Sequence, residues 1–222
     1  MDSTQFTHIS LCSGYGGIDL GLRRVLPGLR TIAYAEIEAF AVENLLARME
    51  GGQLDAAPIW TDLKTFPWGQ FRGTVDILSG GYPCQPFSAA GLRKGADDPR
   101  HLWPWIADGI RLCRPRFCFF ENVEGHITLG LREVISELES IGYKTTWGIF
   151  SASEVGAPHQ RKRIFILGYT DDNGRIASQI RESYTQRSDS NEDRAQSTLQ
   201  FEGSSSSEGG TDQLAYTDSE RH

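Results

Sequence analysis

The chain has 222 residues, which suits one domain of ordinary size with at most a small appendage. Its net charge is −7, but eleven acidic residues against five arginines fall between 171 and 222, so the rest is nearly neutral, which neither supports nor excludes nucleic-acid binding. With no run of about 20 apolar residues, no signal-peptide pattern and no Cys-x-x-Cys pair among four cysteines, we expect a cytoplasmic protein with reduced thiols, no membrane contact and no metal.

Apolar runs and helical periodicities alternate along the first 170 residues. Strands are expected at 7–12, 30–35, 59–60, 75–78, 117–120, 145–150 and 164–167. Helices are expected at 18–26, 38–49, 101–112 and 131–141, several of them followed by glycine or proline. The alternation predicts the α/β class, with a Rossmann-like, doubly wound and mostly parallel sheet that binds ligands at the C-terminal ends of its strands.

The composition changes near residue 170. Only ten of the 52 residues from 171 to 222 are apolar, and ten are serines. Such a segment cannot bury enough apolar surface to fold by itself. We therefore expect one folded domain over residues 1–170 and a low-complexity, disordered tail over 171–222.

A glycine-rich turn follows the first expected strand. Gly14, Gly16 and Gly17 let the backbone approach a ligand closely, and the helix that follows presents free N–H groups, although a plain tight turn would also use glycines. Glu36 ends the second strand about 20 residues further on, where an acidic residue commonly accepts hydrogen bonds from a ribose. Asp62 follows the third strand, where it could meet an adenine amino group or simply cap the next turn.

The segment GGYPCQPFS, residues 80–88, is the most distinctive part of the sequence. It holds Cys84 between Pro83 and Pro86, in a constrained loop and not in an apolar run. A reactive cysteine needs a thiolate and access to its substrate, whereas a structural one is buried. Cys84 therefore has the features of a nucleophile. The other three cysteines, which stand in apolar runs, suit a structural role: Cys12, Cys113 and Cys118.

Two further groups of polar residues adjoin strands. Glu121-Asn122-Val123 comes at the end of the apolar strand 117–120, so the Glu121 carboxyl is expected to be partly removed from water, which suits proton donation, although an ordinary strand-end carboxylate would look the same. Arg161-Lys162-Arg163 comes immediately before the last strand. These cations could hold phosphates or polarise a base carbonyl, or they could form a solvated basic loop.

In this order and spacing, these pieces resemble the cytosine-5 DNA methyltransferase family over residues 8–168. The Pro-Cys-Gln loop and the Glu-Asn-Val triplet are the most specific points of resemblance. The resemblance implies S-adenosylmethionine as the methyl donor and double-stranded DNA as the substrate. Residues 1–170 would then be the donor-binding catalytic domain, and the tail would be a remnant of the region that leads to target recognition.

The resemblance also assigns roles to individual residues. Cys84 would attack C6 of a flipped-out cytosine, Glu121 would protonate N3, and Arg163 would hold O2 with support from Arg161. Asn122 would fix the active-site loop. The remaining assignments concern the donor, whose methionine part would lie on Gly14, Gly16 and Gly17, its ribose on Glu36 and its adenine on Asp62, with Pro83 counted among the donor-binding residues.

The chain departs from the family pattern in three respects. Ser10-Leu11-Cys12 stands where the family usually has Asp-Leu-Phe, which removes an aromatic contact to adenine. His159 replaces the glutamine of the usual Gln-x-Arg-x-Arg segment. No target-recognition domain or closing helix is recognisable after Gly168, so we expect a truncated chain, or one half of a split enzyme that needs a complementing chain.

Three alternative functions are compatible with parts of the sequence. The chain could be a catalytically incompetent or split half, or it could methylate tRNA, because a tRNA-modifying branch shares the Pro-Cys and Glu-Asn-Val elements. A cysteine hydrolase could pair Cys84 with His101, His126 or His159, but it would leave Glu121 without a role. Amino-group methylation is disfavoured, because it typically uses an Asp/Asn-Pro-Pro-aromatic loop. A restriction–modification, phage or orphan setting stays open.

Overall fold

The structure, a computed structural model, describes residues 5–83 and 102–170. The expected tail from 171 to 222 and the expected nucleophile Cys84 lie outside the described residues. None of the described helices is long and apolar enough to cross a bilayer. Within the same two ranges, no three His, Cys, Asp or Glu side chains gather as a metal site.

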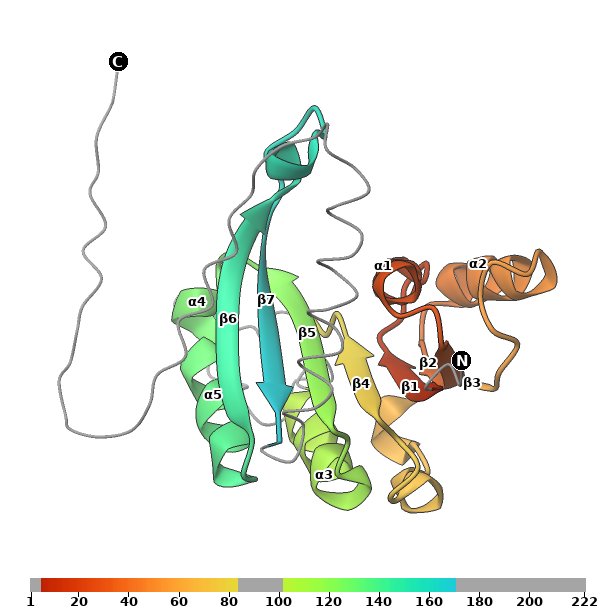
Figure 1. Ribbon diagram of the computed structural model, residues 1–222, viewed down its shortest axis with the longest axis horizontal. Coiled ribbons are helices and arrows are strands. Elements are labelled where there is room, and N and C mark those ends of the chain that lie inside the picture. The colour runs from red at the N-terminus through yellow and green to blue at the C-terminus, as the bar shows by residue number, and fades with distance from the viewer. Residues whose placement is uncertain (1–4, 84–101, 171–222) are drawn as a thin grey trace, which may run out of the picture.

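A seven-stranded sheet forms the centre of the fold (Figure 1). Its strands are β1 (Phe6–Leu11), β2 (Leu29–Ala35), β3 (Ile59–Trp60), β4 (Ile77–Gly80), β5 (Phe117–Val123), β6 (Lys144–Ser151) and β7 (Lys162–Tyr169). Their order across the sheet is β3-β2-β1-β4-β5-β7-β6, and β1 to β5 pair in parallel. Only β7 runs against both of its neighbours, since a short connection from β6 permits an antiparallel pair but not a parallel one.

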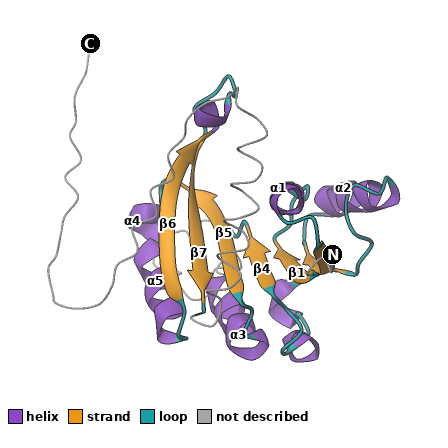
Figure 2. Ribbon diagram, in the orientation of Figure 1, coloured by secondary structure: helices purple, strands orange, loops and turns teal. Residues whose placement is uncertain are grey.

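Helices cover both faces of this sheet, as Figure 2 shows by colour. On one face, Tyr34 of β2 packs with Leu45 of the helix that follows this strand. On the other face, Ile106 and Leu138, which belong to two later helices, pack with Phe120 of β5. The helices are α1 (Gly17–Val25), α2 (Ala39–Glu50), α3 (Trp103–Cys113), α4 (His126–Leu129) and α5 (Leu131–Ser140), with short 3-10 turns η1 (Leu63–Thr65), η2 (Trp68–Phe71) and η3 (Ala152–Val155). The predicted α/β, doubly wound and mostly parallel fold is confirmed.

Most strand boundaries shift by one to three residues from the prediction, and the shifts at β5 and β7 affect the site. β5 continues to Val123, so Glu121 lies inside the strand and not after it. β7 begins at Lys162, so Lys162 and Arg163 belong to the strand and do not precede it. The reason is that β5 and β7 pair as far as Val123 and Arg163, beyond the end of the apolar run. The four-residue helix α4 was also missed, because it is too short to show a helical period.

A buried polar cluster joins α1 to the three strands beneath it. Ser10 Oγ donates to Asp19 Oδ2 at 2.8 Å, and the two ring nitrogens of His8 lie 2.9 Å from Thr31 Oγ1 and 2.8 Å from Ser79 Oγ. His8 and Asp19 are fully buried. Burial lowers the pKa of His8 to about 3 and raises the pKa of Asp19. Because buried polar groups are costly unless they are paired, this cluster fixes how α1 sits on β1, and so fixes the turn between them.

Candidate active site

The glycine turn between β1 and α1 has an open backbone. Gly14 has φ +53° and Gly16 has φ +73°, a region that favours glycine. A Cβ on Gly16 would lie 2.7 Å from Leu54 Cδ1, whereas one on Gly14 or Gly17 would meet no atom of the described residues within 4 Å. The backbone of Gly14 and Gly17 therefore faces open space and is accessible to a ligand.

Glu36 fastens this turn to the end of β2. The Gly14 N–H donates to Glu36 Oε2 at 2.7 Å, and the Glu38 N–H donates to Oε1 at 2.9 Å. The side chain is only 8% exposed. Two carboxylate oxygens offer about four acceptor positions, so Glu36 can still accept hydrogen bonds from a ligand hydroxyl. The structure thus brings together the glycine turn and the acidic residue that the sequence analysis assigned to one site.

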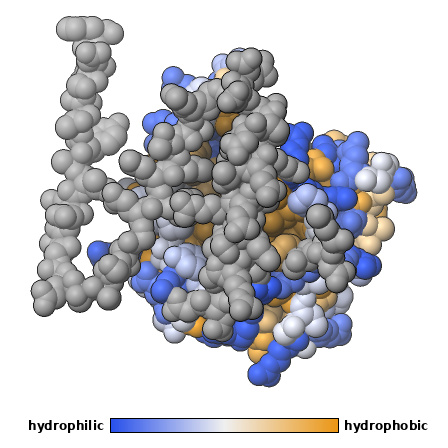
Figure 3. Space-filling model, in the orientation of Figure 1, coloured by the Kyte–Doolittle hydropathy of each residue, from blue (hydrophilic) through white to orange (hydrophobic). Residues whose placement is uncertain are grey.

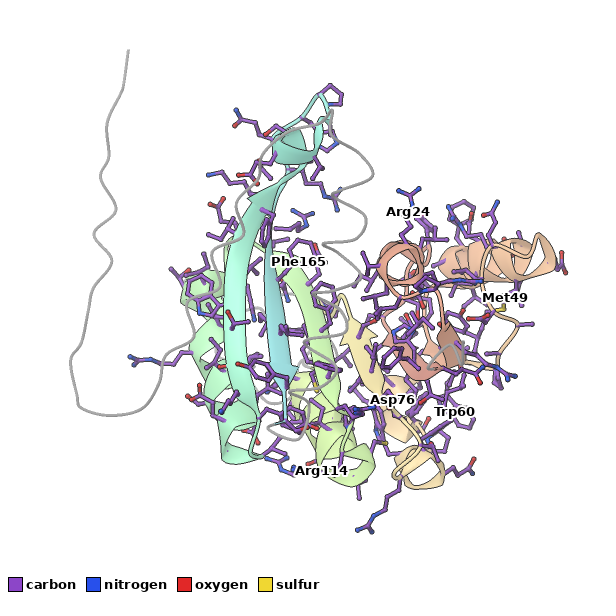
Figure 4. The ribbon with its side chains drawn as sticks, in the orientation of Figure 1. Arg24, Met49, Trp60, Asp76, Arg114 and Phe165 are labelled. Carbon is purple, nitrogen blue, oxygen red and sulfur yellow. The ribbon has the colours of Figure 1, made fainter. Side chains whose placement is uncertain are left out.

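Several large apolar side chains on the segments that meet at Glu36 are exposed, and the sequence analysis did not single them out. Ile37 is 72% exposed, Phe40 67% and Tyr15 53%, and the rings of Tyr15 and Phe40 meet edge to face with centroids 6.2 Å apart. Trp60, labelled in Figure 4, ends the neighbouring β3 and is also exposed. Exposed apolar groups close to a buried polar group are typical of a ligand-binding site. The signal in the sequence was the placing of Ile37 and Phe40 at the start of a helix, where polar residues are usual.

Two other residues on this side have mainly structural partners. Asp62 is exposed, and its Oδ1 accepts the Lys64 N–H at 3.0 Å, which confirms that it caps η1. Cys12 has φ +47°, and its thiol is largely buried next to Glu36. Burial, assisted by the negative charge of Glu36, raises the pKa of Cys12 to about 12. This position supplies a protonated thiol where the family usually has an aromatic ring.

A second group of residues lies at the ends of β4, β5 and β7. Arg163 Nε is 2.6 Å from Glu121 Oε1, and both side chains are about three-quarters buried, at 22% and 25% exposed. Arg163 also donates from Nη1 to the Lys162 carbonyl at 2.8 Å. A Cβ on Gly81, the first residue after β4, would lie 3.2 Å from Glu121 Oε2. The carboxylate and guanidinium therefore sit against the segment that leads from β4 to Cys84.

Aromatic rings lie next to this ion pair on the same face of the sheet. Phe165 of β7, labelled in Figure 4, stacks on Phe119 with ring centroids 5.7 Å apart and meets Phe150 of β6 edge to face at 5.8 Å. Orange, apolar atoms show in the middle of this view of the surface (Figure 3). Since an apolar neighbourhood strengthens electrostatic interactions, these rings reinforce the pair of Glu121 and Arg163.

Other predicted residues are not brought into this group. Arg161 is exposed before β7, and within the described ranges its side chain has no hydrogen-bond or ion-pair partner. Its carbonyl accepts the Ala152 N–H. Pro83 is exposed at the end of the first described range. The supporting role of Arg161 and the donor-binding role of Pro83 stay predictions.

Asn122 holds the start of the cysteine loop, as expected. Its Nδ2 donates to the Tyr82 carbonyl at 3.0 Å, and its Oδ1 accepts the Val123 N–H at 2.9 Å. The Tyr82 phenol oxygen and His126 Nε2 are hydrogen-bonded at 2.9 Å. His126 is fully buried and His159 is exposed before β7. The cysteine-hydrolase alternative therefore gains no support from His126, which is occupied by Tyr82.

The three described cysteines are free thiols of the structural kind. Burial raises the pKa of Cys113 to about 11, and burial raises the pKa of Cys118 further. With Cys12 also shifted upward, none of these three presents a thiolate at neutral pH. The prediction of a structural role for them is confirmed.

Comparisons with known proteins identify the family of the chain. The sequence profile of the family described as C-5 cytosine-specific DNA methylase matches residues 6–220. The chain is similar to the Type II methyltransferase M.NlaX of Neisseria lactamica, with 34% identity over 169 residues, which are 74% of this chain and 52% of that protein. It is similar to the orphan methyltransferase M.SPRI of Bacillus phage SPR, with 30% identity over 171 residues, which are 74% of this chain and 38% of that protein.

Solved structures show the same fold. The crystal structure of the S. pombe Dnmt2 methyltransferase superimposes with a TM-score of 0.64 at 23% identity, covering 75% of this chain and 51% of that one. The chain spans about half the length of M.NlaX and of this solved chain, and less of M.SPRI.

Proposed function

The chain belongs to the C-5 cytosine-specific DNA methylase family, and on this premise we propose that it transfers a methyl group from S-adenosylmethionine to C5 of cytosine in double-stranded DNA. The observation that carries the proposal is the ion pair of Glu121 and Arg163, which lies against Gly81 where β4 leads into Pro83-Cys84. An acid and a cation beside the segment that leads to a cysteine are the groups that attack on a pyrimidine ring requires.

The residues at the ends of β1, β2 and β3 fit an S-adenosylmethionine donor. Glu36 is buried, is already oriented by two backbone N–H groups and has acceptor capacity left for ribose hydroxyls. Gly14 and Gly17 offer open backbone to the methionine part, and the exposed Ile37 and Phe40 offer apolar surface to the purine. When bound, the sulfonium supplies an electrophilic methyl group.

In this proposal Cys84 acts first, as a thiolate that adds to C6 of a cytosine flipped out of the duplex. The Glu121 carboxylate, paired with Arg163, takes up a proton from solvent beforehand. Electron density then moves from the C5–C6 double bond through C4 to N3, where the protonated Glu121 carboxyl donates that proton. The resulting enamine has a nucleophilic C5, which would take the methyl group as the sulfur–methyl bond breaks and S-adenosylhomocysteine leaves. Loss of the C5 proton to solvent then restores the C5–C6 double bond and expels the Cys84 thiolate. N3 gives its proton back to Glu121, so the base leaves neutral and the enzyme returns to its starting state.

Arg163 has two roles in this scheme. Its guanidinium is held by Glu121 and by the Lys162 carbonyl, so its remaining N–H groups keep a fixed direction. We infer that they donate to the cytosine O2 and so hold the ring with its N3 facing the Glu121 carboxyl. The same pairing orients the Glu121 carboxyl toward the ring.

Recognition of a DNA sequence is a separate part of the proposal. The chain spans about half the length of M.NlaX and less of M.SPRI, and sequence is read through contacts to base edges. We propose that a complementing chain or segment supplies those contacts. Methyl transfer by this chain alone therefore needs its own test, apart from the chemistry.

Covalent trapping tests the chemistry directly. The protein is incubated with S-adenosylmethionine and mixed-sequence duplex DNA that contains 5-fluorocytosine, and the products are separated on a denaturing gel. Fluorine cannot leave C5 as a proton does, so Cys84 should stay bound to the DNA. An adduct in the wild type that is absent in Cys84→Ala supports the proposal, and Cys12→Ala serves as a matched control that should still form it.

The other outcomes separate the alternatives. An adduct with 5-fluorocytosine tRNA but not with DNA assigns the chain to RNA. Donor binding by calorimetry without an adduct on either nucleic acid points to a half that needs its complementing chain. An adduct that persists in Cys84→Ala contradicts the assignment of the nucleophile.

A further inference from the structure

Tyr82, two residues before Cys84, is held at both of its ends. Its carbonyl accepts from Asn122 Nδ2 at 3.0 Å, and its phenol oxygen is hydrogen-bonded to His126 Nε2 at 2.9 Å. The ring between them is buried and contacts Trp103 and Phe120, with centroids 5.5 and 5.8 Å away. A residue fixed at its backbone and at the far end of its side chain can neither shift nor turn about its own axis.

The site that receives the Tyr82 phenol is built for an imidazole. His126 is fully buried, and burial lowers its pKa, so it is neutral at physiological pH. Its ring lies edge to face against Tyr82, with centroids 5.5 Å apart. A Cβ on Gly130, at the end of α4, would lie 2.9 Å from His126 Cε1, so only glycine leaves room for the ring there.

The restraint on Tyr82 passes to Cys84 through Pro83. Proline fixes its own φ near −65°, and it restricts the residue before it to an extended backbone. Few free dihedral angles therefore separate the held ring of Tyr82 from the thiol-bearing residue. The direction in which the chain leaves β4 is set by Tyr82, and hence by what holds Tyr82.

We propose that His126 is a positioning residue for the nucleophile, acting through the Tyr82 phenol to fix the direction in which Tyr82-Pro83 leaves β4, and so the starting point of the segment that carries Cys84. This rests on the proposed function, in which Cys84 attacks the cytosine. Asn122 holds the backbone of the same residue, and His126 stops the rotation that Asn122 alone would allow. Gly130 contributes by leaving space for the His126 imidazole.

Amide hydrogen exchange of the ligand-free 222-residue chain tests the restraint without donor or DNA. His126→Leu and Tyr82→Phe each remove the same hydrogen bond, and each should speed exchange in the peptide that contains Cys84 about fivefold. The double variant should be no faster than either single one, because the two residues act through one bond. His126→Gln, which keeps a polar group near the Nε2 position, should return exchange to within about twofold of the wild type.

Tyr143→Phe is the matched control. The Tyr143 hydroxyl is buried and donates to the Pro115 carbonyl, so the variant loses a comparable bond without touching Tyr82. It should leave exchange around Cys84 unchanged. Equal acceleration in Tyr143→Phe and Tyr82→Phe would mean general loosening and would overturn the proposal. Two other results would also overturn it: wild-type exchange around Cys84 that already runs at the intrinsic rate of an unprotected amide, or exchange in His126→Leu that equals the wild-type rate.

Kinetics then connect the restraint to the chemistry. In a preparation that methylates DNA, His126→Leu should lower kcat about tenfold and leave the KM for DNA and donor unchanged, because only the nucleophile is displaced. A rise in KM with unchanged kcat would contradict a positioning role. A wild-type chain that forms no adduct in any preparation argues against the proposed function, whereas the exchange comparison still decides whether His126 holds the segment.

Discussion

Replacing Glu36 by Gln tests the link between the glycine turn and the end of β2. In the wild type the two carboxylate oxygens accept the N–H groups of Gly14 and Glu38 at 2.7 and 2.9 Å. Glutamine has one carbonyl oxygen, so one of these N–H groups would face an amide NH₂ instead of an acceptor. An unsatisfied buried donor costs about 1–3 kcal/mol. In a domain of this size each kcal/mol lowers Tm by roughly 2–4 °C.

The same variant has a second, electrostatic readout. Burial is the main cause of the raised pKa of Cys12, and the negative charge of Glu36 adds to it, bringing the pKa to about 12. Glu36→Gln should therefore lower the pKa of Cys12, while burial still keeps it above that of an ordinary thiol. The measurement is the alkylation rate of Cys12 against pH, followed by mass spectrometry of its peptide.

Glu38→Gln is the control, because Glu38 is exposed, lies two residues after Glu36 and loses the same negative charge. It should change neither Tm by more than about 1 °C nor the Cys12 titration, as expected for a surface substitution. The reasoning fails if Glu36→Gln unfolds at the wild-type temperature, or if both variants shift the Cys12 titration equally. Loss of donor binding in calorimetry for Glu36→Gln alone would extend the result to the proposed ribose contact.

Three further predictions concern other parts of the fold. Gly80→Ala would place a Cβ 2.9 Å from the Leu11 carbonyl, which is backbone and cannot turn aside, so urea unfolding should show a loss of about 1–3 kcal/mol; wild-type stability would count against that packing. In Gly81→Ala the new Cβ would lie 3.2 Å from the Glu121 carboxylate, which is flexible, so the free energy of unfolding should stay within about 1 kcal/mol of the wild type. Trapping of 5-fluorocytosine DNA should nevertheless fall about tenfold or more, because the carboxylate is displaced. Undiminished trapping would refute this prediction. Burial lowers the pKa of His8 from 6.5 to about 3, so between these two pH values the unfolded chain binds one more proton than the folded chain. The free energy of unfolding should therefore fall as pH drops from 6.5 to about 3. His8→Gln should reduce the slope of this free energy against pH by up to about 1.4 kcal/mol per pH unit, and equal slopes in the variant and the wild type would contradict the prediction.

Residues at the ends of parallel strands were predictable from the sequence because their positions follow from one rule. Each strand of β1 to β3 ends at the same edge of the sheet, so a polar residue after each must lie near the others. Gly14 and Glu36 meet there through a hydrogen bond, although 22 residues separate them. Asp62 was placed at this edge by the same reasoning, and its capping bond to Lys64 was among the interpretations left open.

The arrangement of Glu121 and Arg163 was harder to predict, because it depends on the direction of one strand, β7. Nothing local in Lys162–Tyr169 says that β7 runs against β5, yet this direction places Arg163 opposite Val123 and within reach of Glu121. The contact of Tyr82 with His126 spans 44 residues and depends on a four-residue helix with no visible period. Exposed apolar residues such as Ile37 were missed for another reason, since periodicity assigns apolar residues to the core by default.

The order of the strands explains why the two halves of the site face each other. Connections from β1 lead outward through β2 to β3, whereas β4 begins the other half of the sheet, so the order switches between β1 and β4. Open α/β sheets bind ligands at such a switch point, because the segments leaving the two strands diverge and leave a crevice between them. Here the glycine turn leaves β1 and the Gly81–Pro83 segment leaves β4, and Gly80 and Leu11 keep these strands in contact. The residues proposed to bind the donor thus lie at the ends of β1 to β3, and the Glu121–Arg163 pair lies on the other side of the switch point, at the ends of β5 and β7. In the proposed reaction the methyl group would pass from the first group to a cytosine held at the second.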